Sequence, residues 1–576
     1  MTTAWDAIVV GAGPAGMAAA TRLATGGAAT LLVDEQAAPG GQIYRGIEAN
    51  ADRPGLRAIL GDAYLHGAGL ARDLRAAPVT TAFSTAVWRI DPDRRVFTRG
   101  PDGTVAVHTA KALVLATGAM ERPVPMPGWT LPGVMTVGAL QILLKSAELR
   151  PSGRLVLVGT GPLLYLFAAQ CLEAGTGDMT IVDTADRRNL VAAAPRLLGA
   201  LGGVGRDLLG KGLALLSTLR RARVRMIRGA RDIRIARAGT DLVVTLTTGG
   251  GRVSLPCRLV GLHEGVIPLT HTARSVGCAH VFDAEGQAFR PVLDADGLSS
   301  VDGIYIAGDA GGIVGAGASE HAGRIAALAI LKGPGRPKTP PLRPGATPAP
   351  AFRKGPGRAG AERQRAEAAR ERRALARHRA IRPFLDRAYR PAEAIVRPDG
   401  DTLVCRCESV TAADVRRVAA EGCAGPNQAK AYLRVGMGPC QGRLCGPTVS
   451  ALLADVQGTG MDAIGFYRVR PPIKPVTLGE LASLDLPEPR QPCPRRPTST
   501  APTGASPSAS TAGRGCRTPA SPFRKRSAST SFSSWRRSMR RPPAARRTGV
   551  PSPPPSLRCG RGGKARSCRF ARRAGG

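Results

Sequence analysis

The chain has 576 residues, 12 cysteines, a formal net charge of +39 and an apolar content of 43%. This length is too great for one hydrophobic core and predicts two to four domains. No apolar run approaches the roughly 18 residues of a bilayer-spanning helix, so we expect no membrane span. The first apolar strand begins within a few residues of Met1, which leaves no room for a signal peptide. We therefore expect a cytoplasmic protein whose cysteines are reduced thiols or metal ligands.

The positive charge is concentrated late in the chain. Residues 491–576 contain twenty Lys and Arg and no Asp or Glu, and much of the remaining excess lies between Lys332 and Arg397. The segment before Lys332 has no comparable imbalance. The net charge therefore does not indicate a nucleic-acid partner for the folded part of the chain.

The stretch Ala7–Asp34 predicts a strand, a glycine-rich turn, a helix and a second strand that ends in an acid, as in dinucleotide-binding βαβ units. Gly11 makes the tight turn, Gly13 lets the backbone approach a pyrophosphate, and Gly16 lets the helix pack on the strand. The Asp34 carboxylate is expected to accept hydrogen bonds from the ribose hydroxyls, and the neighbouring Glu35 could take its place. The predicted binding residues of the turn are Gly11, Gly13, Pro14, Ala15 and Gly16.

Three later segments support a flavin as the bound dinucleotide. The Gly40–Gly41 turn, followed by Gln42, is expected to bring backbone N–H groups toward the flavin side. An apolar strand ends in Thr117 and Gly118 and returns to the first sheet, and another strand ends in Gly308 and Asp309. There the Asp309 carboxylate and nearby N–H groups are expected to hold the ribityl chain and the pyrophosphate. No cysteine closely follows Gly41, which disfavours a thiol–disulfide reductase.

Residues Arg154–Asp183 repeat the strand, turn, helix and strand pattern, but Leu164 replaces the third glycine. A leucine at this position is expected to widen the helix–strand approach, so NAD(P)H binding is doubtful. Binding of another adenine nucleotide and a purely structural duplicate both remain open.

Four cysteines form the second strong signal, with C-x-C followed after 32 residues by C-x4-C. They are Cys405, Cys407, Cys440 and Cys445. Four thiolates hold either Zn²⁺ or a [2Fe–2S] cluster, and the surrounding glycines free backbone N–H groups for sulfur. The spacing differs from two CxxC zinc knuckles, which favours [2Fe–2S], with zinc and unligated thiols as alternatives. Cys171, Cys257, Cys278 and Cys423 are expected to be buried bystanders.

Composition and motifs divide the chain into four segments. The first is an α/β segment over 1–332, which includes the second nucleotide-binding unit at about 120–290. The second is a linker and helix over 333–398. The cysteine-bearing domain spans 399–487, and a basic tail spans 488–576. Gly333–Gly360 is rich in Pro and Gly, and Ala361–Arg382 predicts a solvated helix. The tail has no apolar periodicity and predicts either disorder or translation from a wrong reading frame, with nucleic-acid binding as the least favoured interpretation.

Several motifs together resemble a known family. They are GAGPAG, PGGQIYR, ALVLATGAMERPVPMPGWTLPGVMT, VGTGPLLYLFA, GIYIAGDA and CRCE…GMGPCQGRLCGP. They resemble the FAD-binding A subunit of bacterial opine oxidases and related subunits of hydroxyproline dehydrogenase and hydrogen cyanide synthase. The cysteine part is similar to bacterioferritin-associated ferredoxin-type [2Fe–2S] domains. The resemblance covers roughly residues 5–490, apart from the linker, and the tail departs from it.

The resemblance implies an α/β, two-dinucleotide-binding-domain (disulfide-reductase-like) flavoprotein fused to a small [2Fe–2S] domain. It implies an electron-transferring subunit of a dye-linked amino-acid or opine dehydrogenase, in a hetero-oligomer with a partner flavoprotein of the D-amino-acid-oxidase kind. It also suggests a second flavin, FMN, between the subunits. The alternatives are a self-contained NAD(P)H-dependent reductase and a basic binding protein without flavin. The sequence indicates no catalytic residue and no final electron acceptor.

Overall fold

The computed structural model describes residues 3–333 and 358–484. The expected tail at 488–576 and most of the expected linker lie outside these residues. A first sheet has the strand order β3-β2-β1-β6-β5-β4, with β19 paired to β6. Strands β1, β2, β3, β6 and β19 run parallel, and β4 and β5 are antiparallel additions. Their bounds are β1 Thr3–Val10, β2 Thr30–Val33, β3 Thr80–Ala82, β4 Ala86–Ile90, β5 Arg95–Arg99, β6 Val105–Leu115 and β19 Ile304–Ile306.

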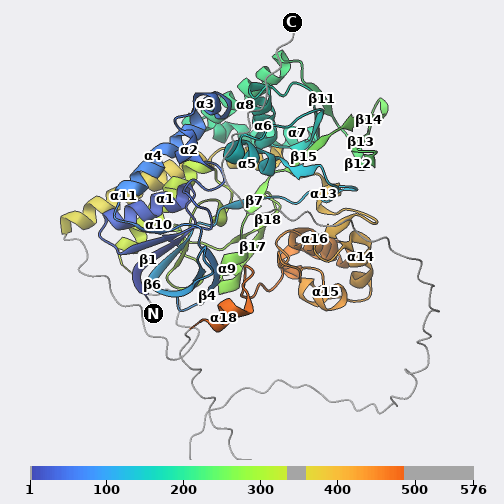
Figure 1. Cartoon of the computed structure of the whole chain (residues 1–576). Helices are drawn as coiled ribbons and strands as arrows, with labels where there is room; N and C mark the ends of the chain where they lie inside the picture. The colour runs from blue at the N-terminus through green and yellow to red at the C-terminus, as the bar shows by residue number, and fades with distance from the viewer. Residues whose placement is uncertain (1–2, 334–357, 485–576) are drawn as a thin grey trace, which may run out of the picture. The chain divides into compact units, whose positions relative to one another are not determined.

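The two faces of this sheet carry alternate residues of each strand. In β1, Ala7 and Val9 join a core with helices on one face, and Ile8 and Val10 join a second core on the other. Figure 1 shows α1 and α10 side by side over the sheet. The helices of this part are α1 Pro14–Thr25, α2 Ile47–Asn50, α3 Pro54–Leu60, α4 Asp62–Ala76, η2 Gly308–Gly311 and α10 Ala316–Leu331.

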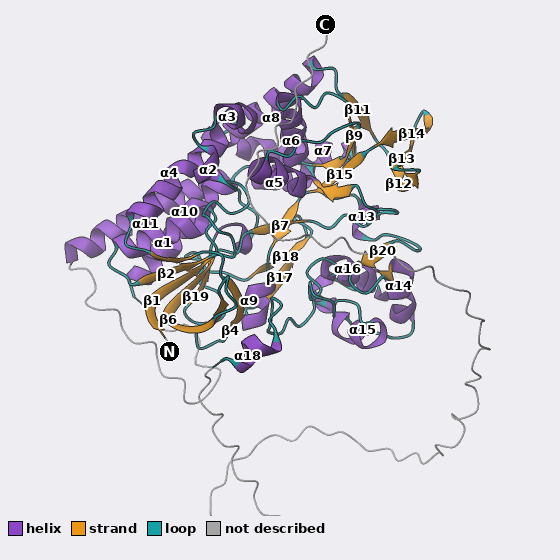
Figure 2. Cartoon of the chain, viewed as in Figure 1, coloured by secondary structure: helices purple, strands orange, loops and turns teal. Residues whose placement is uncertain are grey.

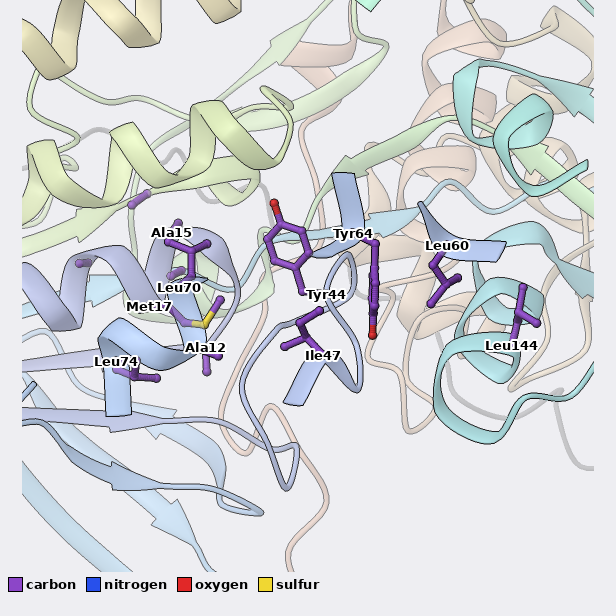
Figure 3. Packing of buried hydrophobic residues seen from close by; sticks show 14 of the residues in the cluster. Ala12, Ala15, Met17, Tyr44, Ile47, Leu60, Tyr64, Leu70, Leu74 and Leu144 are labelled. Atoms are coloured by element: carbon purple, nitrogen blue, oxygen red, sulfur yellow. The ribbon is translucent and has the colours of Figure 1, made fainter. Parts of the chain in front are cut away.

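The helical core continues from the α1 region toward the second unit. In Figure 3 the Tyr64 ring stands between Tyr44 and Ile47 on one side and Leu60 and Leu144 on the other. All five side chains are buried, with at most 5% of their surface exposed. The apolar surface removed from water here holds α2, α3 and α4 against helix α5 (Val137–Ala147) of the next unit.

The second unit is built on a fully parallel sheet of order β11-β10-β9-β15-β8. Its strands are β8 Val134–Thr136, β9 Leu155–Thr160, β10 Met179–Asp183, β11 Arg225–Arg228 and β15 Leu259–Glu264. Its helices are α5 Val137–Ala147, α6 Pro162–Glu173, α7 Arg187–Ala193, η1 Ala194–Ala200 and α8 Gly203–Arg221. All six residues of β9 are buried, as expected for a central parallel strand.

Short antiparallel pieces complete the α/β part. They are the β12–β14 sheet (Arg231–Ala238, Asp241–Thr248, Gly251–Cys257), the pair β7 and β16 (Ala119–Glu121, Val266–Pro268), the pair β17 and β18 (His280–Asp283, Ala288–Pro291) and helix α9 (His271–Val276). The pair β7 and β16 joins the two parallel-sheet units, because the chain leaves the first unit through β7 and returns through β16. Two βαβ units in one α/β chain are the fold class that the sequence predicts.

After the undescribed segment, α11 (Arg358–Arg379) packs along α10 and is followed by α12 (Arg382–Ala388) and α13 (Glu393–Val396). The expectation of a fully solvated helix is wrong for one face of α11. Ala368 and Leu375 are buried, and Glu367 receives two hydrogen bonds from the Arg22 guanidinium, at 2.7 and 2.8 Å. The charged composition suggested solvent, but acidic residues on this face pair with basic residues of α1 and α10.

The cysteine-bearing segment has its own hydrophobic core around Val415, Val449 and Leu452. Figure 2 shows it as a group of short helices beside a two-stranded piece. Its elements are β20 Leu403–Cys405, β21 Val410–Thr411, α14 Ala412–Ala420, α15 Pro426–Leu433, α16 Gly446–Gln457, α17 Met461–Ile464 and α18 Leu478–Ala482. Across residues 3–333 and 358–484, no helix has the length and hydropathy that a membrane crossing requires.

Candidate functional site

The glycine-rich turn joins β1 to α1. Gly11 has a φ of +105°, and a Cβ there would lie 2.4 Å from the carbonyl oxygen of Ala116. A Cβ on Gly16 would lie 1.7 Å from the carbonyl oxygen of Gly11, so only glycine lets the helix approach this closely. Helix α1 begins at Pro14 with Gly13 as its N-cap and no side-chain cap. Its first N–H groups and the positive end of its dipole are therefore available to an anion.

The acid at the end of β2 lies against this turn. Oδ2 of Asp34 accepts a hydrogen bond from the Ala12 N–H at 2.5 Å, and Oδ1 accepts one from the Gln36 N–H at 2.7 Å. Burial raises the pKa of the Asp34 carboxyl, and these two N–H groups oppose the rise. The neighbouring Glu35 instead pairs with Lys474 Nζ at 2.6 Å. Of the two predicted acids, Asp34 is thus the one that faces the turn.

The Gly40–Gln42 loop crosses the turn from the other side. The Gly40 N–H donates to the carbonyl oxygen of Ala12 at 2.9 Å. Gly41 has a φ of +61°, and a Cβ on it would lie 2.8 Å from the Cα of Gly13. A Cβ on Gly13 would in turn have the Cα of Gly41 as its nearest atom, at 3.8 Å. The two glycines therefore form a cradle with bare backbone on both sides.

The Thr117–Gly118 segment leaves the first sheet beside this cradle. The Ala116 N–H donates to the Val10 carbonyl at 2.9 Å, which keeps the end of β6 next to the end of β1. Thr117 Oγ1 then donates to the carbonyl oxygen of Leu269 at 3.2 Å, and the Leu269 N–H donates to the Gly118 carbonyl at 3.0 Å. These bonds tie the start of β7 to the end of β16.

The Gly308–Asp309 segment reaches α1 from β19. Gly308 has a φ of +72°, and a Cβ there would lie 2.8 Å from the Cβ of Ala15. Oδ1 of Asp309 accepts hydrogen bonds from the N–H groups of Val314 and Gly315, at 2.7 and 2.9 Å. This carboxylate orders the turn that leads into α10. The structure therefore brings all four predicted cofactor segments to one edge of the first sheet.

This edge fits a dinucleotide such as FAD. The cradle between Gly13 and Gly41 is a space that a Cβ on either residue would fill, and the uncapped α1 end supplies N–H donors for a pyrophosphate. Asp34 supplies an acceptor at the distal end of the motif. When bound, FAD would supply the ability to accept and release two electrons.

The corresponding edge of the second unit is filled by the chain's own groups. Leu164, at the third glycine position, is fully buried and packs in the helical core. The Tyr165 hydroxyl donates to Oδ2 of Asp183, the acid at the end of β10, at 2.8 Å. Glu264, at the end of β15, is 1% exposed and accepts from Thr184 Oγ1 at 2.6 Å. Burial raises the pKa of the Glu264 carboxyl.

The segment between α12 and α13 closes this edge further. The Ala392 N–H donates to Oε2 of Glu264 at 3.3 Å, and Ile395 is buried in the core that contains Val158 and Val182. Burial and the Asp183 charge raise the pKa of the Tyr389 hydroxyl. Residues 389–396 therefore occupy the carboxyl edge of the second sheet, where a second dinucleotide would otherwise bind.

The four predicted cysteines lie close together, because the side chain of Cys445 affects the pKa of Cys405 and that of Cys440 affects the pKa of Cys407. Cys405 and Cys445 are buried, Cys440 is half-buried and Cys407 is exposed. The Cys445 side chain, together with backbone N–H groups that include that of Gly436, lowers the pKa of Cys405 to about 6. Thiolates and N–H donors to sulfur are the groups that a [2Fe–2S] cluster uses, so the cluster stays a prediction for these four cysteines. In the described ranges, however, no three His, Cys, Asp or Glu side chains converge in a metal-coordinating arrangement.

Tyr467 supports the cysteine loops from within. Its ring is 2% exposed, and its hydroxyl lies 3.8 Å from the Sγ of Cys445. A Cβ on Gly436 or Gly442 would lie 2.6 or 2.3 Å from the ring. These glycines therefore make room for an aromatic ring, which the sequence did not indicate.

The four cysteines that were expected to be bystanders, Cys171, Cys257, Cys278 and Cys423, are all buried.

The loop between Cys440 and Cys445 touches the α/β part. His271 Nε2, at the start of α9, donates to the carbonyl oxygen of Gln441 at 3.1 Å. Burial lowers the pKa of His271 to about 4, so the ring is neutral at pH 7. The Arg274 guanidinium lies 4.3 Å from the centre of the Phe466 ring. This contact places the cysteine loop against the segment that directly follows β16.

Comparisons with known proteins identify the family of this chain. Residues 5–326 match the family described as pyridine nucleotide-disulphide oxidoreductase, and residues 399–484 match the sarcosine oxidase A3 domain. The chain is 47% identical to the A subunit of opine oxidase from Rhizobium meliloti (strain 1021), over 84% of this chain and 99% of that protein. The chain belongs to the family of opine oxidase A subunits.

Two further similarities place this family member more broadly. It is 33% identical to hydrogen cyanide synthase subunit HcnB of Pseudomonas aeruginosa, over 83% of this chain and 98% of that protein. The crystal structure of L-proline dehydrogenase from P. horikoshii has the same fold, with a TM-score of 0.55 and 17% identity over 83% of this chain and 80% of that one.

The family and the fold identify this relative of the opine oxidase A subunits as an FAD-dependent oxidoreductase. The disulfide-reductase-like fold class and the family resemblance are confirmed, and FAD is supported as the cofactor. The [2Fe–2S] cluster and FMN stay predictions. Sequence reasoning missed Tyr165, Glu264, His271 and Tyr467, because no spacing marks residues whose partners lie far away in the chain.

Proposed function

We propose that this chain is the electron-transferring FAD subunit of a multi-subunit opine or amino-acid dehydrogenase. A partner flavoprotein of the D-amino-acid-oxidase kind takes the electrons from the substrate and delivers them to this chain. The relatives named as subunits of opine oxidase and hydrogen cyanide synthase support a hetero-oligomer of this type. An FMN between the subunits and a cytoplasmic location belong to the same proposal.

The observation that carries the proposal is the contact between the cysteine loop and the α/β part. Gln441 lies between Cys440 and Cys445, and its carbonyl oxygen accepts the hydrogen bond from His271. FAD can accept electrons in pairs and pass them on one at a time, and a [2Fe–2S] cluster on Cys405, Cys407, Cys440 and Cys445 would accept and release them singly. The chain's own residues keep the two candidate sites in one folded unit.

The second unit argues that the electrons come from a partner and not from NAD(P)H. The Tyr165 hydroxyl donates a hydrogen bond to one carboxylate oxygen of Asp183. The Thr184 hydroxyl and the Ala392 N–H each donate a hydrogen bond to one carboxylate oxygen of Glu264. A nicotinamide nucleotide would have to displace residues 389–396 and break these buried bonds, each of which costs free energy when left unmade. These contacts disfavour the self-contained reductase.

An anaerobic visible spectrum of the purified chain tests the proposal. We expect flavin and cluster absorption that stoichiometric NADH leaves unchanged. Co-expression with a D-amino-acid-oxidase-like partner should allow octopine, nopaline or an amino acid to bleach the flavin. Rapid bleaching of the isolated chain by NADH would refute the partner-dependent function and establish the reductase.

A Cys405→Ser variant separates the two halves of the proposal. With the partner present, substrate should still bleach the flavin, but reduction of a one-electron acceptor should be lost. Cys423→Ala is the matched control, because Cys423 is buried in the same domain and lies outside the four-cysteine spacing. Equal acceptor reduction by both variants would contradict the role of the four thiols.

A further inference from the structure

Lys145 is a buried lysine that no motif indicates. It lies near the end of α5, and 4% of its surface is exposed. Its Nζ donates to the carbonyl oxygens of Gln42 at 3.3 Å and Ile43 at 2.9 Å, and to Oε1 of Gln141 at 2.9 Å. An ammonium group has three N–H donors, and these three acceptors use all of them.

Tyr64, whose ring Figure 3 shows beside Tyr44 and Ile47, also binds this loop. Its hydroxyl donates to the carbonyl oxygen of Arg45 at 2.8 Å. Asn50 Nδ2 donates to the Tyr64 hydroxyl at 2.9 Å and to the carbonyl oxygen of Lys145 at 2.7 Å. Lys145 and Tyr64 are thus two parts of one buried network that binds backbone carbonyls of the loop following Gly41.

The network also reaches the second unit. Nε2 of Gln141 donates to Oε1 of Gln170 at 2.9 Å, and Gln170 lies in α6 with 4% of its surface exposed. Buried amides and an ammonium are costly unless every partner is present. Lys145 therefore links the second unit's helix rigidly to the cofactor loop of the first unit.

The loop that follows Gly41 has free N–H donors next to the carbonyl oxygens that Lys145 binds. Within the described residues, the N–H groups of Gly41, Gln42 and Ile43 have no hydrogen-bond acceptor. The Gln42 carbonyl and the Ile43 N–H belong to one peptide group, so the ammonium polarises that N–H and strengthens it as a donor. Free N–H groups and a nearby positive charge, beside the Gly13 cradle, suit an electron-rich ligand.

The charges around Lys145 do not neutralise it. Burial, with a smaller contribution from Arg45, lowers the pKa of Lys145 to about 7. Its hydrogen-bond partners within the described chain are two carbonyls and an amide, with no carboxylate among them. Lys145 is therefore half protonated at pH 7 and mostly protonated at pH 6. In its protonated form, a buried cation of this kind has its largest electrostatic effect on a bound group that gains negative charge.

We propose that Lys145 is a positioning residue for the bound FAD, which holds the Gln42–Arg45 loop at the cradle and favours the reduced flavin over the oxidised one. The inference rests on the proposed function only through FAD and needs neither the partner subunit nor the cysteine cluster. Reduction adds negative charge to the flavin, so loss of the ammonium should weaken binding of the reduced form more than binding of the oxidised form.

The test compares Lys145→Met with Tyr64→Phe in the full chain. Lys145→Met removes the charge and the clamp, whereas Tyr64→Phe removes only one hydrogen bond to the same loop. Lys332→Met, which removes an exposed ammonium after α10, is the matched control. The measurements, all made at pH 6 where Lys145 is mostly protonated, are FAD affinity by fluorescence titration, the flavin midpoint potential by equilibration with a redox dye, and thermal unfolding.

We expect at least tenfold weaker FAD binding for Lys145→Met and a smaller loss for Tyr64→Phe. We expect the flavin potential to fall only in Lys145→Met, and a tenfold larger loss for the reduced flavin equals about 30 mV. Unchanged affinity and potential in Lys145→Met, or an equal potential shift in Tyr64→Phe, would overturn the role of Lys145. A folded wild-type chain that does not bind FAD would overturn the cofactor assignment itself, whereas failure with every partner subunit would leave the Lys145 inference standing.

Discussion

Gly13→Ala separates cofactor binding from folding. Gly13 has φ and ψ of −75° and −175°, a conformation that alanine adopts without strain. The nearest atom to an added Cβ is the Cα of Gly41 at 3.8 Å, which is an ordinary van der Waals contact. The folded chain therefore has room for the methyl group, but that methyl group occupies the space where the backbone approaches the pyrophosphate.

The expected loss follows from the hydrogen bonds that the methyl group prevents. A hydrogen bond to a charged group contributes about 1.5–3 kcal/mol, so the loss of one or two such bonds weakens FAD binding by about 3 kcal/mol. This corresponds to about a 100-fold higher dissociation constant. The free energy of unfolding of the chain without FAD should change by less than about 1 kcal/mol, because the mutation also restricts the unfolded chain.

FAD titration of the deflavinated chain, followed by flavin fluorescence, measures the affinity, and urea unfolding of the same sample measures stability. Gly69→Ala in α4 is the matched control, since no atom lies within 4 Å of its added Cβ. Gly69→Ala should keep its FAD. If Gly13→Ala binds FAD as tightly as Gly69→Ala does, the cradle is not the pyrophosphate site.

Three further predictions use other contacts. Gly16→Ala should prevent folding of the first unit, because its Cβ would lie 1.7 Å from a backbone carbonyl oxygen; a soluble variant with wild-type thermal stability would contradict this. Cys445→Ser should abolish bound iron in metal analysis of anaerobically purified protein, whereas Cys257→Ser should retain it, and equal iron in both would exclude the four-thiol site. The pKa of Lys145, about 7, lies below the value of about 10.4 for an unfolded lysine, so the folded chain binds fewer protons between these pH values. The free energy of unfolding of the wild-type chain should therefore rise by about 2 kcal/mol from pH 7 to 9, relative to that of Lys145→Met. Urea unfolding at several pH values measures both, and the same change with pH in the two proteins would refute the shift in the pKa of Lys145.

Local patterns predicted many of the elements. In the unit expected over Ala7–Asp34, helix α1 begins directly after the glycine-rich turn, and strand β2 ends at Val33, one residue before the acid. The helix expected at Ala361–Arg382 is α11, shifted by three residues at each end. Its buried face could not be predicted, because Glu367 finds its partner Arg22 far away in the chain.

The sequence by itself determined the glycine-rich turn, the acid after β2, the strand that precedes Gly308 and the four cysteines. These features are encoded locally, since a positive φ such as that of Gly11, or a backbone approach such as that at Gly16, admits only glycine. Only the tertiary structure decided that residues 389–396 cover the second unit and that Lys145 holds the loop after Gly41. Buried polar groups must find partners, and those partners lie in segments far apart in the chain, beyond the reach of any spacing rule.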